Sequence, residues 1–117
     1  LSGNQFGGSV ESTKLADVGT AIRTSDSARN AQIGGADPAL ANLIGNASFG
    51  VSLAGPGGHR VLGNAIGDAG FQSLPNGVGV VLLSPANRVE DNLIARNTQI
   101  NVLLSGESAQ FNVVANN

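Results

Sequence analysis

The stretch Asn87-Arg88-Val89-Glu90-Asp91-Asn92 repeats a pattern that occurs twice more in the chain. The earlier copy is His59-Arg60-Val61-Leu62-Gly63-Asn64, and the later copy is Gln110-Phe111-Asn112-Val113-Val114-Ala115-Asn116. The first valine of each copy, at positions 61, 89 and 113, recurs after 28 and then 24 positions. A repeat of roughly 20–30 residues, with short apolar pieces between Asn and Gly, is typical of a chain that stacks on itself in coils.

Other apolar residues recur at similar intervals, so each coil is expected to contribute three strands. The expected columns are Val61, Val89 and Val113, preceded by Ile33; Ile44, Ile66 and Ile94, preceded by Phe6; and the segments 19–22, 50–53, 79–82 and 101–104. Within these segments apolar residues tend to alternate, as a strand with one buried face requires.

The links between these strands are too short for the helical crossovers that normally join parallel strands. A solenoid removes the difficulty, because each strand pairs with its counterpart one coil away. The sequence therefore predicts an all-β parallel β-helix, about four coils of three short strands, open at both ends. We expect one segment over 1–117, with loop insertions at 34–41 and 67–76, where Gly, Pro, Asp and Asn are frequent. A further insertion is expected at 8–18, the least regular stretch, which could form a longer loop or an extra strand.

Composition excludes several classes of protein. Only 12% of residues are charged and the net charge is −2, which argues against a nucleic-acid partner. No apolar run approaches the roughly 18 residues of a membrane span. Without cysteine there is no disulfide framework or thiolate metal site. Because the chain starts at Leu1 without Met, we interpret it as a piece of a longer protein. No amphipathic capping helix is predicted at either terminus, and 100–117 resemble strand material almost to the last residue, so we expect more chain or another subunit to continue the stack.

Five short phrases resemble one known family. They are Asn30-x-x-Ile-Gly-Gly35, Asn42-Leu-Ile-Gly-Asn46, Asn64-Ala-Ile-Gly67, Leu74-Pro-Asn76 and Gly77-Val-Gly-Val80. Their order and spacing are similar to those of the bacterial right-handed parallel β-helix repeat proteins of the pectate-lyase-like superfamily. The resemblance covers roughly 19–117 and implies a right-handed coil, which agrees with the general rule for parallel crossovers. It also implies a secreted or cell-surface location.

Asparagine is the most informative polar residue, with 13 copies in the chain. Asn tolerates left-handed backbone geometry at bends, and its amide bonds to nearby backbone groups. Stacked Asn side chains also bond to one another in β arrays. We predict that Asn64, Asn92 and Asn116 form one structural ladder, in preference to contacting a sugar or a metal.

Candidate ligand-binding residues are few. Arg60 and Arg88 each precede a column valine, so they are expected to point outward and lie one strand spacing apart. Together with His59, Glu90 and Asp91 they could hold an anionic sugar. The plainer interpretation is an Arg88–Glu90 surface ion pair, with His59 as a solvent-facing turn residue.

No catalytic set and no cofactor is predicted. The sequence lacks a phosphate-binding loop, a zinc-spaced His pair and a Gly-x-Ser-x-Gly elbow. Asp68 offers a single carboxylate, which is too few ligands for a calcium site.

Three functions remain open. The favoured one is a rigid structural or interaction segment without its own active site, whose partners are the rest of a longer β-helix, a second copy at an open end, or a polysaccharide. The second is a fragment of a polysaccharide lyase, hydrolase or epimerase with an Arg-lined groove. The third is a trimeric phage-tail or adhesin stalk.

Overall fold

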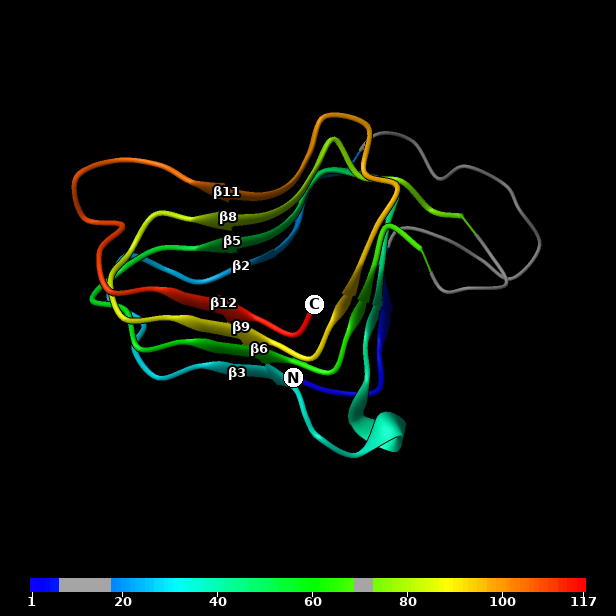
Figure 1. Ribbon diagram of the computed structural model, residues 1–117, viewed down its shortest axis with the longest axis horizontal. Coiled ribbons are helices and arrows are strands. Elements are labelled where there is room, and N and C mark those ends of the chain that lie inside the picture. Colours follow the sequence, from blue (N-terminus) through cyan, green and yellow to red (C-terminus); the bar gives the residue numbers. More distant parts are fainter. Residues whose placement is uncertain (7–17, 69–72) are drawn as a thin grey trace.

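A computed structural model describes residues 1–6, 18–68 and 73–117. Their strands form three parallel sheets of four strands each (Figure 1). Sheet 1 contains β1 (Gln5–Phe6), β4 (Leu43–Ile44), β7 (Ala65–Ile66) and β10 (Leu93–Ile94). Sheet 2 contains β2 (Val18–Arg23), β5 (Ala47–Leu53), β8 (Val78–Leu82) and β11 (Ile100–Leu104). Sheet 3 contains β3 (Gln32–Gly34), β6 (Arg60–Leu62), β9 (Arg88–Glu90) and β12 (Val113–Ala115).

The chain visits the sheets in rotation, so every strand pairs with strands about one coil away in sequence. In Figure 1 the strands of sheets 2 and 3 lie one above another in the order of their colours, and sheet 1 closes the side between them. This is the predicted all-β parallel solenoid. Four strands in each sheet correspond to about three turns of the chain, slightly fewer than the expected four coils.

The interior is filled by aliphatic side chains stacked in register. Ile33 pairs with Val61 and Val61 with Val89 in sheet 3. In sheet 1, Ile44, Ile66 and Ile94 are paired in succession. The buried cluster is Ile22, Ile33, Ile44, Val51, Leu53, Val61, Ile66, Val80, Leu82 and Val89. Each fully buried aliphatic side chain contributes about 1.5–3 kcal/mol of hydrophobic stabilisation.

Two of the expected registers need correction. In sheet 2, Ile22 pairs with Val51 rather than with Leu53, a shift of two residues that keeps the same face inward. In sheet 3, Val89 pairs with Val114, whereas Val113 pairs with Arg88. A one-residue shift exchanges the two faces of a strand, so Val113 belongs to the outer column and Val114 to the inner one.

The corner between sheets 3 and 1 carries an Asn ladder. The ladder consists of Asn4, Asn42, Asn64, Asn92 and Asn117. From Asn42 onward, each member receives on its side-chain oxygen the backbone N–H and the side-chain amide of the Asn one coil earlier. The predicted Asn64–Asn92 step is present at 3.0 Å. The last member is Asn117 rather than Asn116, because the last coil is shifted by one residue from the expected register, as the pairing of Val114 with Val89 shows.

Asn116 supplies a left-handed backbone bend and is not a member of the ladder. Its φ is 53°, and the residue one coil earlier, Asp91, has a φ of 54°. Asn and Asp adopt this left-handed conformation more readily than most residues. The pair therefore lies at a bend of the backbone immediately before the ladder.

The predicted insertions are described only in part. Residues 7–17 and 69–72 lie outside the described residues, which removes most of 8–18 and part of 67–76 from view; Val18 is the first residue of β2. Within 34–41 a short 3-10 helix spans Pro38–Leu40, and the Asp37 side chain accepts the N–H of Ala39 at its start.

Candidate functional site

The two arginines of the repeat lie in one outward column. Arg60 pairs with Arg88 across the β6–β9 register, and both side chains are exposed. Gln32 precedes them in the column and Val113 follows. Neighbouring strands are about 4.8 Å apart, so sheet 3 places the two cations side by side, as the alternation of the sequence requires.

Arg88 is largely neutralised by a carboxylate on its own strand. Its Nε donates to Glu90 Oε2 at 3.1 Å, and its Nη2 donates to Glu90 Oε1. Hydrogen bonds from Arg88 hold the pKa of the Glu90 carboxyl below its ordinary value; partial burial opposes this, and the charges of Arg88 and Arg60 assist it. The same bonds raise the pKa of Arg88. A forked Arg–carboxylate pair of this kind leaves little capacity for an external anion.

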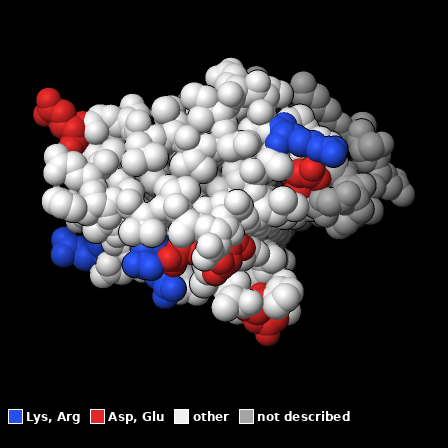
Figure 2. Space-filling view, viewed as in Figure 1, with Lys and Arg blue, Asp and Glu red and all other residues white. Residues whose placement is uncertain are grey.

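The Arg60 guanidinium is less engaged in polar contacts than that of Arg88. No ion pair involves Arg60 within the described part of the chain. Asp91 lies in a left-handed bend and is exposed, and its backbone N–H donates to Ala115 O. The face drawn in Figure 2 is mostly uncharged, and its basic atoms lie close to acidic ones over much of the lower part of the view, the side of sheet 3.

His59 does not face solvent, contrary to the expectation for a turn residue. Its exposed fraction is 0%. Its Nδ1 accepts the N–H of Ala31 at 3.1 Å, and its Nε2 lies 2.8 Å from Ala54 O. Because Nδ1 accepts, the ring proton is on Nε2, which donates to Ala54. Both nitrogens are engaged, so the ring has no free atom with which to act as a base.

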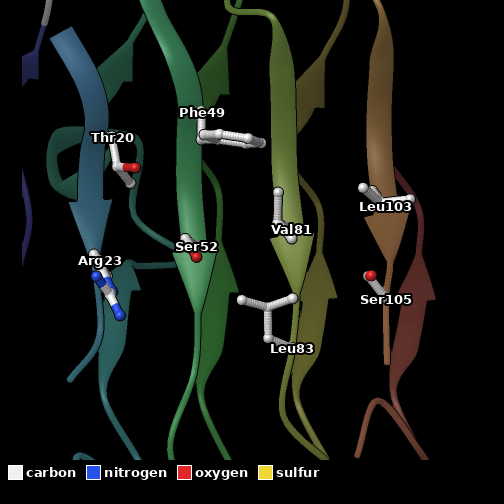
Figure 3. A pocket seen from close by; sticks show the side chains of 8 residues that line it. All are labelled: Thr20, Arg23, Phe49, Ser52, Val81, Leu83, Leu103 and Ser105. Atoms are coloured by element: carbon white, nitrogen blue, oxygen red, sulfur yellow. The ribbon is translucent and has the colours of Figure 1, made fainter. Parts of the chain in front are cut away.

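Sequence reasoning missed a shallow groove on the outer face of sheet 2 (Figure 3). Its volume is about 350 Å³. Phe49 and Leu83, each 40% exposed, flank a floor that includes Val81. The full lining is Thr20, Arg23, Phe49, Ser52, Val81, Leu83, Leu103 and Ser105.

One signal in the sequence points to this groove. The run Val80–Leu83 is apolar at every position, and a strand without alternation carries apolar side chains on both faces. The only charged residue of the lining is Arg23, whose guanidinium lies 3.8 Å from the Asp26 carboxylate. A lining of this kind offers contact surface and holds no acid–base pair.

Groups suited to hold a metal are missing from the part of the chain that the structure describes: no three His, Asp or Glu side chains gather there. The Asp68 carboxylate is 2.9 Å from the Arg96 guanidinium. Among residues 1–6, 18–68 and 73–117, no helix has the length and apolarity needed to span a membrane.

These observations define the class of protein: an all-β parallel β-solenoid of about three turns with buried Asn side chains at its corners. Comparison with known proteins adds no closer assignment, since no family model, no curated protein and no solved structure matches the chain.

Proposed function

We propose that this segment is a rigid structural or interaction module of a secreted or surface-associated bacterial β-helix protein, without an active site of its own. The observation that carries the proposal is that its buried polar side chains are hydrogen-bonded within the fold. No buried side-chain nitrogen or oxygen among the described residues lacks a hydrogen-bond partner. The groups that could do chemistry, such as His59 and the ladder Asn residues, are engaged in bonds that join one coil to the next.

We also propose the handedness of the coil, the superfamily and the location of the protein. A right-handed coil of the pectate-lyase-like type is supported by the order of the Asn-x-x-Ile-Gly and Gly-Val-x-Val phrases, which now lie on stacked strands. Parallel crossovers are right-handed in nearly all proteins. The extracellular bacterial location rests on the resemblance alone.

The alternative is a fragment of a polysaccharide lyase, hydrolase or epimerase whose groove runs along the arginine face. The in-register, exposed pair Arg60 and Arg88 favours it. Two features weigh against it. Arg88 is held by Glu90, and glycoside hydrolysis needs two carboxylates about 5–9.5 Å apart across the sugar, whereas the carboxylate nearest this column is already paired.

A glycan array probed with the full chain at low and high salt tests the proposal. The module interpretation predicts no tight binding and no chain cleavage or epimerisation of acidic or neutral polysaccharides. Tight, salt-sensitive binding that is abolished by Arg60→Ala/Arg88→Ala, but kept in the matched Arg23→Ala variant on sheet 2, would overturn the preference for the module. Cleavage or epimerisation of the bound polysaccharide would then establish the alternative.

A further inference from the structure

The groove on the outer face of sheet 2 is formed by the two central strands of that sheet, β5 and β8. Val81 lies between Val80 and Leu82, which belong to the buried cluster, so its side chain points outward. Only 5% of Val81 is nevertheless exposed, because Phe49 and Leu83 flank it (Figure 3). An outward residue that is nearly covered by its neighbours shows that this part of the face is hollowed.

The size of the groove suits a small molecule. Its volume of about 350 Å³ lies in the range of 300–1,000 Å³ that is typical of small-molecule sites. The groove crosses the sheet from Arg23 on β2 to Leu103 on β11, which is three strand spacings, or about 14 Å. Eight residues line it, whereas a standard protein interface uses about 20–30 residues on each side. An elongated small ligand therefore fits better than a protein partner.

The middle of the groove has few groups that can form hydrogen bonds. Both edges of β5 and of β8 are paired with neighbouring strands, so their backbone groups are used within the sheet. Among Phe49, Ser52, Val81 and Leu83, which form this middle part, only Ser52 is polar, and it is 9% exposed. A peptide or a sugar would leave several of its own polar groups without partners here, which is costly. An alkyl chain carries no such groups.

One end of the groove carries a positive charge. Arg23 is the only charged residue of the lining. Its guanidinium lies 3.8 Å from the Asp26 carboxylate, and the two side chains are 65% and 89% exposed. A pair this open to water is weak, so the guanidinium can accept an anionic group of a ligand.

We propose that the groove binds an amphiphilic anion, an unbranched alkyl chain with a carboxylate head, as in a fatty acid. The carboxylate lies at Arg23, and the alkyl chain crosses the sheet over Val81, between Phe49 and Leu83. Charge complementarity sets the orientation of the ligand, and burial of its alkyl chain supplies most of the affinity. The site lies on sheet 2, apart from the arginine column of sheet 3, and goes beyond the module function proposed above.

Titration of the full chain with dodecanoate, below its micellar concentration and at neutral pH, tests the apolar part of the site. Methyl NMR should show saturable shifts at Val81, Leu83 and Leu103. Leu83→Ser should weaken binding by about fivefold or more, since it removes one apolar wall. Leu83 is already 40% exposed in the parent chain, so this substitution leaves the core intact, and an unchanged amide spectrum away from the groove verifies the fold.

Substitution of Arg23 tests the charged end. Arg23→Ala should weaken dodecanoate binding by about two- to fivefold and leave binding of the uncharged dodecanol unchanged. Arg23→Glu should reverse the preference, so that dodecylammonium binds more tightly than dodecanoate. Arg29→Ala is the matched control, because Arg29 is an exposed arginine of the same coil outside the lining; it should bind dodecanoate as the parent chain does.

Two results would overturn the proposal outright: no saturable shifts at the three methyl-bearing residues, or unchanged affinity in Leu83→Ser. Equal losses in Arg23→Ala and Arg29→Ala would overturn the placement of the carboxylate. Dimerisation of the parent chain in sedimentation, abolished by Leu83→Ser, would assign the groove to a second copy instead. Glycan binding enters none of these measurements, so failure of the module proposal is recognised separately.

Discussion

His59 and Asn87 occupy equivalent corner positions in consecutive coils, and the backbone N–H of His59 donates to Asn87 Oδ1 at 3.0 Å. The imidazole Nδ1 of His59 accepts the N–H of Ala31 from the preceding coil. One coil later, the Asn87 side-chain oxygen accepts the N–H of His59 in the same way. The neutral histidine is thus a substitute for asparagine in a structural ladder.

His59→Ala is expected to destabilise the protein by about 2–4 kcal/mol. It leaves the part-buried N–H of Ala31 without its acceptor, removes one of the two donors to the buried Ala54 carbonyl, which keeps the Thr24 hydroxyl, and opens a cavity. His59→Asn restores an acceptor for Ala31 and should recover about half of that loss. Chemical unfolding of both variants measures the difference. Equal stability of the two variants would contradict the role assigned to the ring.

Truncation of the column valines tests the register of the last coil. Val89 is fully buried, so Val89→Ala should cost about 2–3 kcal/mol. Val113 lies in the outer column with Arg88, so Val113→Ala should stay within about 0.5 kcal/mol. Val114→Ala should fall between them, because Val114 continues the inner column at an uncovered end. A larger loss for Val113 than for Val114 in thermal or chemical unfolding would reverse the register.

Asn92 in the ladder and Asn116 at the C-terminal bend should respond differently to substitution. Asn92 accepts from Asn64 and donates to Val61 O and Asn117 Oδ1, so Asn92→Ala should cost about 2–4 kcal/mol. Asn116 supplies a left-handed φ, which glycine adopts freely. Asn116→Gly should therefore be nearly neutral in the same unfolding measurement, and a severe loss would place Asn116 in the ladder.

The Arg88–Glu90 pair gives stability a defined pH dependence. The folded-state pKa of Glu90 lies below its ordinary value of 4.5, mainly through its hydrogen bonds to Arg88. A depressed carboxyl pKa contributes stability that is fully present above the unfolded-state pKa and is lost as the pH falls through the folded-state pKa.

NMR titration of the Glu90 carboxyl provides the measurement. Arg88→Ala should raise the pKa of Glu90 toward its ordinary value, and Arg60→Ala should raise it less, because Arg60 acts only through its charge. An unchanged pKa in Arg88→Ala would show that the forked pair does not persist in solution.

The amino-acid sequence by itself determined the stacked architecture. Short apolar segments recurring every two to three dozen residues, with Asn and Gly between them, can bury their side chains only by stacking on their own copies. The columns through Val61 and Val89 and through Ile44, Ile66 and Ile94 follow directly, because each column residue holds the same place in its repeated phrase. Valine follows arginine in both copies, and isoleucine is the second residue after asparagine in all three. Pairing of Arg60 with Arg88 follows from the same register.

Only the tertiary structure decided the register of the last coil and the role of His59. The doublets Val113–Val114 and Asn116–Asn117 each place two identical side chains side by side, so periodicity alone cannot choose between them. The choice is made by the backbone, which bends at Phe111 with a φ of 56°, as it does at Ala86 one coil earlier. His59 is polar yet buried, because its ring is satisfied by a donor, the N–H of Ala31, and an acceptor, the carbonyl of Ala54, which reach the ring only when the coil closes.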